Sequence, residues 1–380
     1  MGRSQIGTKR IVYVTGSRAE YGRMRSTLRA IEASSKLKLS LIVLGMHLSN
    51  EFGCTIKEIE KDKFQIDAKL GTIPKGDSGG AMAKALGTSI MAIASTLEAS
   101  EYNAMLILGD RGDMLAAALA GAHMNIPIAH VGGGYVSGSI DNRIRNAITT
   151  FSNIHFTANA KTARRLIALG ADPSYVHIVG APDLDAIVNR EFPKPKQVLN
   201  EFNLDPAKSV LLVSQHPVTT EFESASEQMQ ETIKALTKVN CQTVLTYPNA
   251  DAGGRKMIRI IDEYEGSSYL RIYRNISYSL YLGLMNVADV MIGNSSAGII
   301  EAPSFGLPVV NIGTRQQGRE RAENVMDVGY DQNEIIEAIQ KALTPKFRRI
   351  AKRSENPYGD GKTGPRIAKI LEETILERIG

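Results

Sequence analysis

Short apolar runs alternate along the chain with longer stretches of helical spacing, a pattern typical of parallel α/β proteins. In the first half, the apolar runs predict strands at residues 9–14, 39–44, 106–108, 126–131, 154–158 and 176–179. The stretches between them predict helices at residues 18–33, 81–100, 114–123, from about 142, and 161–169. Residues 55–75 are rich in charged side chains and predict loops with one short strand.

The same alternation restarts after Phe192 to Lys196, a charged and proline-rich stretch that is the best linker candidate. Strands are predicted at residues 210–214, 242–246, 269–273, 290–292 and 308–312. Helices are predicted up to residue 238, around 277–287, after the turn at 293–298, and at 366–378. Two α/β units in series predict a doubly wound domain over residues 1–192 and a second over 197–362, with a ligand bound between them.

Length and composition favour a soluble globular protein over a membrane or secreted protein. The chain has 380 residues, more than one ordinary core needs, and 43% of them are hydrophobic. No window approaches the ~20 uninterrupted apolar residues of a membrane span. The basic N-terminus is followed by an apolar run, Ile11 to Val14, that is too short for a signal sequence. We therefore expect a cytoplasmic protein with no membrane partner.

Charge and cysteine content exclude further classes of protein. The net charge of +5 is mild, and no Lys/Arg block interleaved with aromatic residues predicts nucleic-acid binding. A local positive site for a phosphorylated small molecule remains compatible with this charge. Cys54 and Cys241 lie far apart in sequence and have no Cys or His neighbour at metal-ligand spacing. We expect neither a disulfide framework nor a metal site.

Two neighbouring strand ends in the first half concentrate polar and glycine residues. The strand at 106–108 runs into Gly109–Asp113, and the strand at 126–131 runs into Gly132–Tyr135 and then Ser137–Asp141. In open α/β sheets, ligands bind at the carboxyl ends of the strands. This edge is therefore where we expect the chemistry.

Three carboxylates at this edge, Asp110, Asp113 and Asp141, are catalytic candidates. Each also precedes or begins a predicted helix, where an Asp commonly caps the helix and contributes about 1 kcal/mol. Clustering with Arg111 and a nearby histidine, His130, favours catalysis, because carboxylates in one cleft can divide acid and base roles. His216, at the first strand end of the second half, would approach from across the cleft.

The second half contains the best candidate for a phosphate site, at Gly293–Gly298. Its small residues, Ser295, Ser296 and Gly298, lie at a strand-to-helix turn, where free N–H groups and the helix dipole favour an anion. A plain helix cap is the alternative, and Arg315 on the next strand end favours the anion site. Glu301 could accept hydrogen bonds from two adjacent ribose hydroxyls.

The first strand-to-helix turn carries neither of the common nucleotide fingerprints. The glycine pattern of dinucleotide-binding proteins is missing after Val14, and no P-loop occurs. We therefore expect no NAD or other cofactor. Arg18, at the start of the first helix, is either an anion contact or a surface residue beside a turn.

At these residues the chain resembles the hydrolysing UDP-N-acetylglucosamine 2-epimerases of the sialic- and nonulosonic-acid pathways. The matching segments are VTGSRAEYG (14–22), GMHLSNEFG (45–53), GDRGDMLAAALA (109–120), SGSIDNRIRNAIT (137–149), HPVTTE (216–221), YPNADAG (247–253), IGNSSAGIIEAPSFGLPVVNIGTRQQGR (292–319) and NPYGDG (356–361). The resemblance implies a GT-B-like fold of two Rossmann-like domains, with a final helix (363–380) packing back on the first. It also implies a homodimer or homotetramer that binds a nucleotide sugar.

The resemblance also implies roles for individual residues. Catalytic roles fall to Asp110, Asp141, His216 and Asp113. Nucleotide contacts fall to Arg18, Arg111, His216, Asn249, Ser295, Ser296, Glu301 and Arg315, with Gly298 in the same loop. The chain departs from the family pattern at Gly132, Tyr135 and Asn146, so one family acid or base is missing or replaced.

The implied reaction begins with anti elimination of UDP from UDP-N-acetylglucosamine, which gives a 2-acetamidoglucal. Water then adds at C1 and a proton returns to C2 from the opposite face, releasing N-acetylmannosamine. Three alternatives stay open: the same chemistry on a UDP-2,4-diacetamido-6-deoxy sugar or on a GDP-linked donor, a GT-B glycosyltransferase, and a nucleotide-sugar-binding protein that has lost catalysis.

Overall fold

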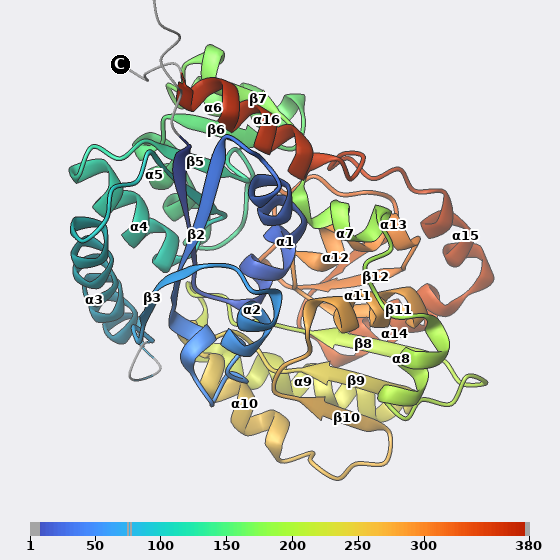
Figure 1. Ribbon diagram of the computed structural model, residues 1–380. Coiled ribbons are helices and arrows are strands. Elements are labelled where there is room, and N and C mark those ends of the chain that lie inside the picture. Colours follow the sequence, from blue (N-terminus) through green and yellow to red (C-terminus); the bar gives the residue numbers. More distant parts are fainter. Residues whose placement is uncertain (1–7, 74–75, 77, 377–380) are drawn as a thin grey trace, which may run out of the picture.

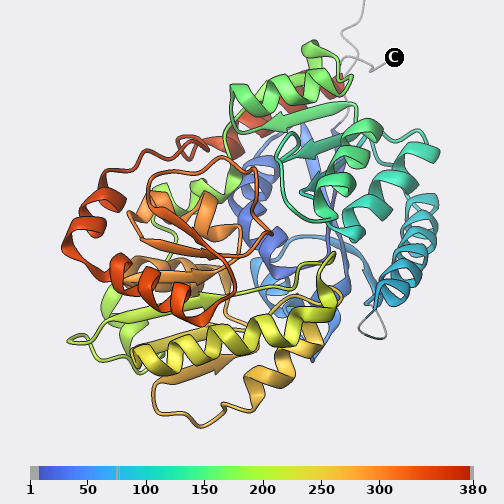
Figure 2. The same ribbon diagram turned by 180° about the vertical axis from the view of Figure 1, so that it is seen from behind.

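Two parallel β-sheets lie side by side, and helices cover both faces of each (Figures 1 and 2). The computed structural model describes residues 8–73, 76 and 78–376. The first sheet has the strand order β3-β2-β1-β4-β5-β6-β7, and the second has the order β10-β9-β8-β11-β12-β13. Every strand pair is parallel. The predicted fold of two doubly wound α/β halves is confirmed.

The first sheet has apolar, mostly buried central strands and two edge strands without a buried residue. They are β1 (Lys9–Thr15), β2 (Leu37–Leu44), β3 (Ile66–Leu70), β4 (Ala104–Leu108), β5 (Ile128–Val131), β6 (Ile154–Thr157) and β7 (Val176–Ile178). The helices of this half are α1 (Arg18–Glu32), α2 (Ile56–Asp62), α3 (Gly79–Glu98), α4 (Gly112–His123), α5 (Asp141–Phe151), α6 (Ala160–Ala168) and α7 (Asp185–Val188). Strand order reverses at β1 and β4, and in such sheets the reversal point is where a ligand crevice opens.

The second sheet follows the same plan. Its strands are β8 (Val210–Ser214), β9 (Gln242–Thr246), β10 (Leu270–Tyr273), β11 (Val290–Gly293), β12 (Val309–Ile312) and β13 (Val325–Val328). Its helices are α8 (Pro195–Glu201), α9 (Ala225–Val239), α10 (Gly254–Asp262), α11 (Tyr278–Val287), α12 (Ala297–Ile300), α13 (Ala302–Phe305), α14 (Gln332–Leu343) and α15 (Pro345–Arg353). The last helix, α16 (Thr363–Leu376), packs on α1 of the first half (Figure 1).

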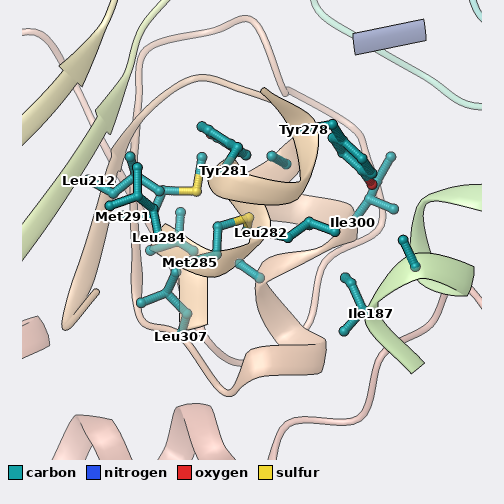
Figure 3. Close-up of a cluster of buried hydrophobic side chains, with 14 of the residues drawn as sticks. Ile187, Leu212, Tyr278, Tyr281, Leu282, Leu284, Met285, Met291, Ile300 and Leu307 are labelled. Atoms are coloured by element: carbon teal, nitrogen blue, oxygen red, sulfur yellow. The ribbon is translucent and has the colours of Figure 1, made fainter. Parts of the chain in front are cut away.

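The hydrophobic core of the second half also takes in side chains from the end of the first. Figure 3 shows Ile187 of α7 at the edge of a buried cluster that also contains Tyr278 and Leu282 of α11 and Ile300 of α12. The segment that joins the halves is therefore anchored by burial rather than free. Because this cluster spans the expected linker, the domain boundaries at residues 192, 197 and 362 stay a prediction.

Several predicted elements differ from the structure. Residues 55–75 contain the helix α2 as well as the short strand β3, so the prediction of loops at the position of α2 was wrong. The last helix begins at Thr363 rather than at residue 366, and residues 377 and 378, also predicted helical, lie outside the described residues.

Within the described residues, α3 is the one helix whose length and mean hydropathy of 1.2 would suit a membrane span. It packs along α4, with Ser89, Ile93 and Leu97 buried, while Met91 stays exposed.

Candidate active site

A cavity opens between the two sheets, at the carboxyl ends of β1, β4, β5, β8, β9 and β11. It brings together most of the predicted site residues, from both halves of the chain. Those lining it are Arg18, Asp110, Arg111, Asp141, His216, Asn249, Ser295, Ser296, Glu301 and Arg315.

The turn after β1 is built around Glu20, whose side chain is almost fully buried. Its carboxylate accepts hydrogen bonds from the backbone N–H groups of Gly16 (2.8 Å) and Ser17 (3.0 Å). This capping arrangement fixes the start of α1. Arg18 follows and reaches the second half, where its guanidinium donates to the Ile276 carbonyl oxygen and lies 5.6 Å from the centre of the Tyr281 ring.

Asp110 is held by an arginine that the sequence did not single out. Arg145 of α5 forms an ion pair with the Asp110 carboxylate and also donates to the Tyr135 carbonyl oxygen at 2.9 Å. The Arg145 side chain is 1% exposed. Helix α4 has Arg111 as its N-cap, so Asp110 lies before the cap and the helix-cap alternative is wrong for it.

Asp141 comes from the next loop and faces the second half. Its carboxylate lies 3.7 Å from the Arg315 guanidinium, and the Gly138 N–H donates to the Arg315 carbonyl oxygen at 3.1 Å. Asp141 is the first residue of α5, whose N-cap is Ile140, so it is not the cap either. The Asp141 loop and the Arg315 loop therefore meet directly across the cavity.

Arg111 links three loops around the cavity. Its guanidinium lies 3.0 Å from the Asp251 carboxylate of the second half and 3.7 Å from that of Glu20. Asp251 in turn accepts a hydrogen bond from the Asn249 side chain at 2.6 Å. These carboxylates hold the pKa of Arg111 above its usual value in spite of burial, so the side chain stays cationic.

His216 is oriented by backbone contacts that decide its tautomer. Its Nδ1 lies 3.1 Å from the Asn249 backbone N–H, which can only donate, so Nδ1 is the acceptor. Burial, followed by three nearby arginines, holds the pKa of His216 well below its usual range. The ring is therefore neutral near pH 7 and carries its proton on Nε2. A neutral ring of this tautomer offers a ligand a hydrogen-bond donor rather than a base.

The predicted phosphate loop follows β11. A side chain on Gly293 would place its Cβ 2.3 Å from the Ser214 carbonyl oxygen, and the backbone there has a φ of 120°, so both space and conformation require glycine. The Ser295 hydroxyl accepts a hydrogen bond from the Ala297 N–H at 3.3 Å, whereas Ser296 makes no side-chain cap. The Ser296 hydroxyl is therefore available to a ligand in the cavity.

The helix expected after this loop is present but short. It consists of the single turn α12 followed by α13, in which Pro303 lacks the N–H that would continue the hydrogen-bond ladder. The dipole argument for an anion is correspondingly weaker. Gly298 does not line the cavity: a Cβ there would lie 2.9 Å from Val309, so this glycine lets α12 pack on β12.

Glu301 lies between α12 and α13 and is almost fully buried. The Tyr278 hydroxyl lies 3.2 Å from its carboxylate and 3.2 Å from the Asp183 carbonyl oxygen. Burial, and then the negative charge of Asp183, raises the pKa of Glu301 to about 8. Arg23 pairs with the Asp183 carboxylate at 3.4 Å. Three further residues that line the cavity, Tyr278, Asp183 and Arg23, were not selected from the sequence.

Asp113 and His130 do not line the cavity, contrary to prediction. Asp113 accepts from the Ser89 hydroxyl at 3.3 Å and lies under the turn after β1, where a Cβ on Gly16 would come within 2.3 Å of its carboxylate. His130 is fully buried and its Nε2 lies 2.8 Å from the Gly109 carbonyl oxygen. His130 thus contacts the end of β4, just before Asp110, whereas Asp113 packs under the turn after β1.

Within the described residues, no group of three or more His, Cys, Asp or Glu side chains could hold a metal ion. The charges that face a ligand come instead from the arginines of both halves. They are Arg18, Arg23, Arg111, Arg145, Arg274, Arg315 and Arg319.

Sequence comparison places these features in one family. The model of a family described as UDP-N-acetylglucosamine 2-epimerase matches residues 29–372. A Legionella pneumophila protein named UDP-N,N'-diacetylbacillosamine 2-epimerase (hydrolyzing) is 39% identical over 97% of both chains. A Neisseria meningitidis serogroup B protein named UDP-N-acetylglucosamine 2-epimerase is 34% identical over 88% of both chains. The chain belongs to the UDP-N-acetylglucosamine 2-epimerase family.

Solved structures confirm the GT-B-like fold of this 2-epimerase family member. A UDP-GlcNAc 2-epimerase from Neisseria meningitidis, bound to UDP-GlcNAc, superposes with a TM-score of 0.81 at 19% identity, covering 96% of this chain and 100% of that one. The Staphylococcus aureus MnaA–UDP complex gives a TM-score of 0.81 at 18% identity, with coverages of 97% and 98%. At these identities the likeness shows the fold alone.

Gly132 and Tyr135, where this 2-epimerase family member departs from the expected pattern, both line the cavity. Gly132 has a φ of 82°, a conformation that favours glycine. A Cβ at Gly132 would lie 3.5 Å from the Tyr135 ring. The tyrosine ring therefore takes up the space beside the glycine.

Arg145 is the functional candidate that sequence reasoning missed most clearly. It lies four residues after Asp141 on α5, a spacing that places both side chains on one helix face. That spacing was the available signal.

Proposed function

We propose that this chain is a hydrolysing 2-epimerase that converts UDP-N-acetylglucosamine to N-acetylmannosamine and UDP. One observation carries the proposal. The cavity of this 2-epimerase family member is lined by two carboxylates, Asp110 and Asp141, together with arginines, His216 and the Ser296 hydroxyl. Carboxylates suit proton abstraction from a sugar, and cations with hydrogen-bond donors suit a departing diphosphate.

In the first step, a carboxylate removes the C2 proton while the C1–O bond to UDP breaks on the opposite face, leaving a 2-acetamidoglucal. Asp110 and Asp141 are the candidates for this base. Ion pairs with Arg145 and Arg315 hold these two carboxylates at the cavity.

The charge that develops on the leaving diphosphate is stabilised from several sides. Arg18 and Arg315 approach from the two halves, and His216 offers its Nε2–H group. Glu301 binds the ribose in this proposal, and Tyr278 holds its carboxyl group. In the second step, water adds at C1 and a proton returns to C2 from the other face.

A second substrate is favoured by the 39% identical Legionella relative, whose name gives UDP-N,N'-diacetylbacillosamine. The chemistry at C1 and C2 is the same for both sugars. A panel of UDP-N-acetylglucosamine, the diacetamido-6-deoxy UDP-sugar and a GDP-linked donor, scored by nucleotide release, identifies the preferred one.

The experiment that tests the reaction class is turnover in D₂O without an acceptor. We expect UDP and a free sugar that carries deuterium at C2 with inverted configuration there. A glycosyltransferase requires an acceptor and leaves the C2–H bond intact, and a binding protein without catalysis releases nothing. A free sugar with protium at C2 and unchanged configuration would exclude the 2-epimerase.

We further propose that the protein is a cytoplasmic homodimer or homotetramer without a cofactor or metal, and that it serves sialic- or nonulosonic-acid biosynthesis. A Polysialic acid biosynthesis protein P7 from Escherichia coli, 31% identical over 97% of this chain, supports the pathway. Light scattering of the purified chain measures the oligomeric state.

A further inference from the structure

We propose that Tyr135 is the acid that returns a proton to C2 in the second half of the reaction. This inference rests on the proposed 2-epimerase function and deepens it. Inversion at C2 needs one group to remove the proton from one face and another to deliver it on the opposite face. A single carboxylate cannot reach both faces of a bound sugar, so a second proton-carrying group must line the cavity.

Tyr135 is placed to be that group. Its side chain lines the cavity, and no hydrogen-bond partner for its hydroxyl occurs in the part of the chain that the structure describes. The hydroxyl oxygen of Tyr135 is accessible and is not one of the buried side-chain oxygens that lack a hydrogen-bond partner. The O–H group is therefore open to the cavity rather than sealed in the core.

The ring that carries this hydroxyl is fixed in place. Arg319 lies 5.5 Å from the ring centre, and the Tyr358 ring meets it edge-on with centroids 5.6 Å apart. Arg145 binds the Tyr135 carbonyl oxygen and the Asp110 carboxylate, so one side chain holds both groups. Preorganisation of this kind is what a proton-transfer group requires.

The protonation states divide the roles. Burial, and then the negative charge of Asp183, holds the pKa of Tyr135 well above its usual value, so the phenol keeps its proton at neutral pH. Asp110 is ion-paired with Arg145 and is suited to the base. The guanidinium of Arg319 over the ring favours the phenolate that forms when the proton leaves.

The step balances without a further reactant. The Tyr135 O–H bond breaks and its proton forms the new C2–H bond, while the electron pair of the glycal double bond is used at C2. Water adds to the cationic C1 and loses one proton to solvent. The phenolate then regains a proton from water.

Tyr135→Phe is the direct test, because it keeps the ring and removes only the hydroxyl. With the donor that the wild type turns over, we expect UDP release to continue while epimer formation falls by about 10²–10⁴-fold and 2-acetamidoglucal accumulates. The matched control is Tyr269→Phe, whose hydroxyl pairs with the Thr237 hydroxyl at 2.7 Å outside the cavity. It should form epimer at the wild-type rate.

Epimer formation by Tyr135→Phe at the wild-type rate would overturn the assignment while leaving the epimerase function intact. Failure of the wild type to release UDP from any donor would instead contradict the proposed function. If the variant fails to bind UDP and is therefore misfolded, a second measurement on the wild type tests the assignment. The wild type is given 2-acetamidoglucal, and the rate of glycal hydration is measured against pH. A hydration rate that is constant from pH 6 to 9 supports a phenol as the proton donor. A hydration rate that decreases as the pH rises, as expected when a carboxylic acid must stay protonated, contradicts it.

Discussion

At the scale of single residues, the ion pairs of Asp110 and Asp141 differ in how deeply the arginine partner is buried. Asp110 pairs with Arg145, which is 1% exposed, so loss of the Asp110 charge leaves a cation buried without compensation. The side chains of Asp141 and Arg315 are 17% and 15% exposed, and 3.7 Å separates their charged atoms. The same substitution should therefore have different consequences for stability at the two positions.

Asp110→Asn and Asp141→Asn form a matched pair that separates catalysis from stability. Both should lower UDP release by about 10²–10⁴-fold, because each removes a candidate base. Urea unfolding should show a loss of about 1–3 kcal/mol for Asp110→Asn and less than about 1 kcal/mol for Asp141→Asn. A variant that keeps wild-type turnover would remove its carboxylate from the mechanism.

The raised pKa of Glu301 predicts a pH-dependent stability. Its usual value is 4.5 and burial raises it to about 8, so the folded chain binds this proton more tightly than the unfolded chain. The resulting stabilisation is fully present below about pH 4.5 and is lost as the pH rises through about 8.

Glu301→Gln removes this titration and serves as the reference. The free energy of unfolding of the wild type, relative to the variant, should fall by more than about 1 kcal/mol between pH 5 and pH 9. Parallel stability curves for the two proteins would show that Glu301 titrates normally.

At the scale of helices and strands, the apolar runs predicted the central elements well. Strands such as β4 and β8 are buried on both faces, so their sequences are continuously apolar and easy to identify. Short or half-exposed elements were missed, among them α2, α10, β13, α14 and α15. In β13, for example, the strand VMDV carries an exposed Asp327 and no buried residue, so its pattern is not that of a core strand.

The site was predicted to the level of loops but not of contacts. Strand ends and glycine turns indicated which loops meet, because the carboxyl ends of parallel strands share one edge. Whether a carboxylate points into the cavity depends on the partners that other elements supply. Asp110 and Asp113 look alike in sequence, yet Arg145 holds one at the cavity and Ser89 holds the other below it.

At the scale of the whole molecule, the two halves meet through loops on opposite sides of the cavity. Glu51 of the first half forms a two-point ion pair with Arg255 of the second, at 2.7 and 2.9 Å. On the other side, Gly138 donates to the Arg315 carbonyl oxygen, and the Arg319 side chain lies near Val136. Contact between the halves therefore holds Asp141 and Arg315 together.

Gly138→Ala tests whether this close approach is needed for catalysis. A Cβ at Gly138 would lie 2.1 Å from the Thr314 carbonyl oxygen, a backbone atom that can yield only if the two loops separate. We expect kcat to fall at least tenfold, while calorimetry shows a smaller loss of UDP affinity, because the UDP contacts proposed for Ser295 and Glu301 do not depend on the Asp141 loop. Gly87→Ala in α3, where a Cβ meets nothing within 4 Å, is the control and should match the wild type in both measurements. Wild-type kcat in a folded Gly138→Ala protein would mean that the carboxylate loop works without contact between the halves.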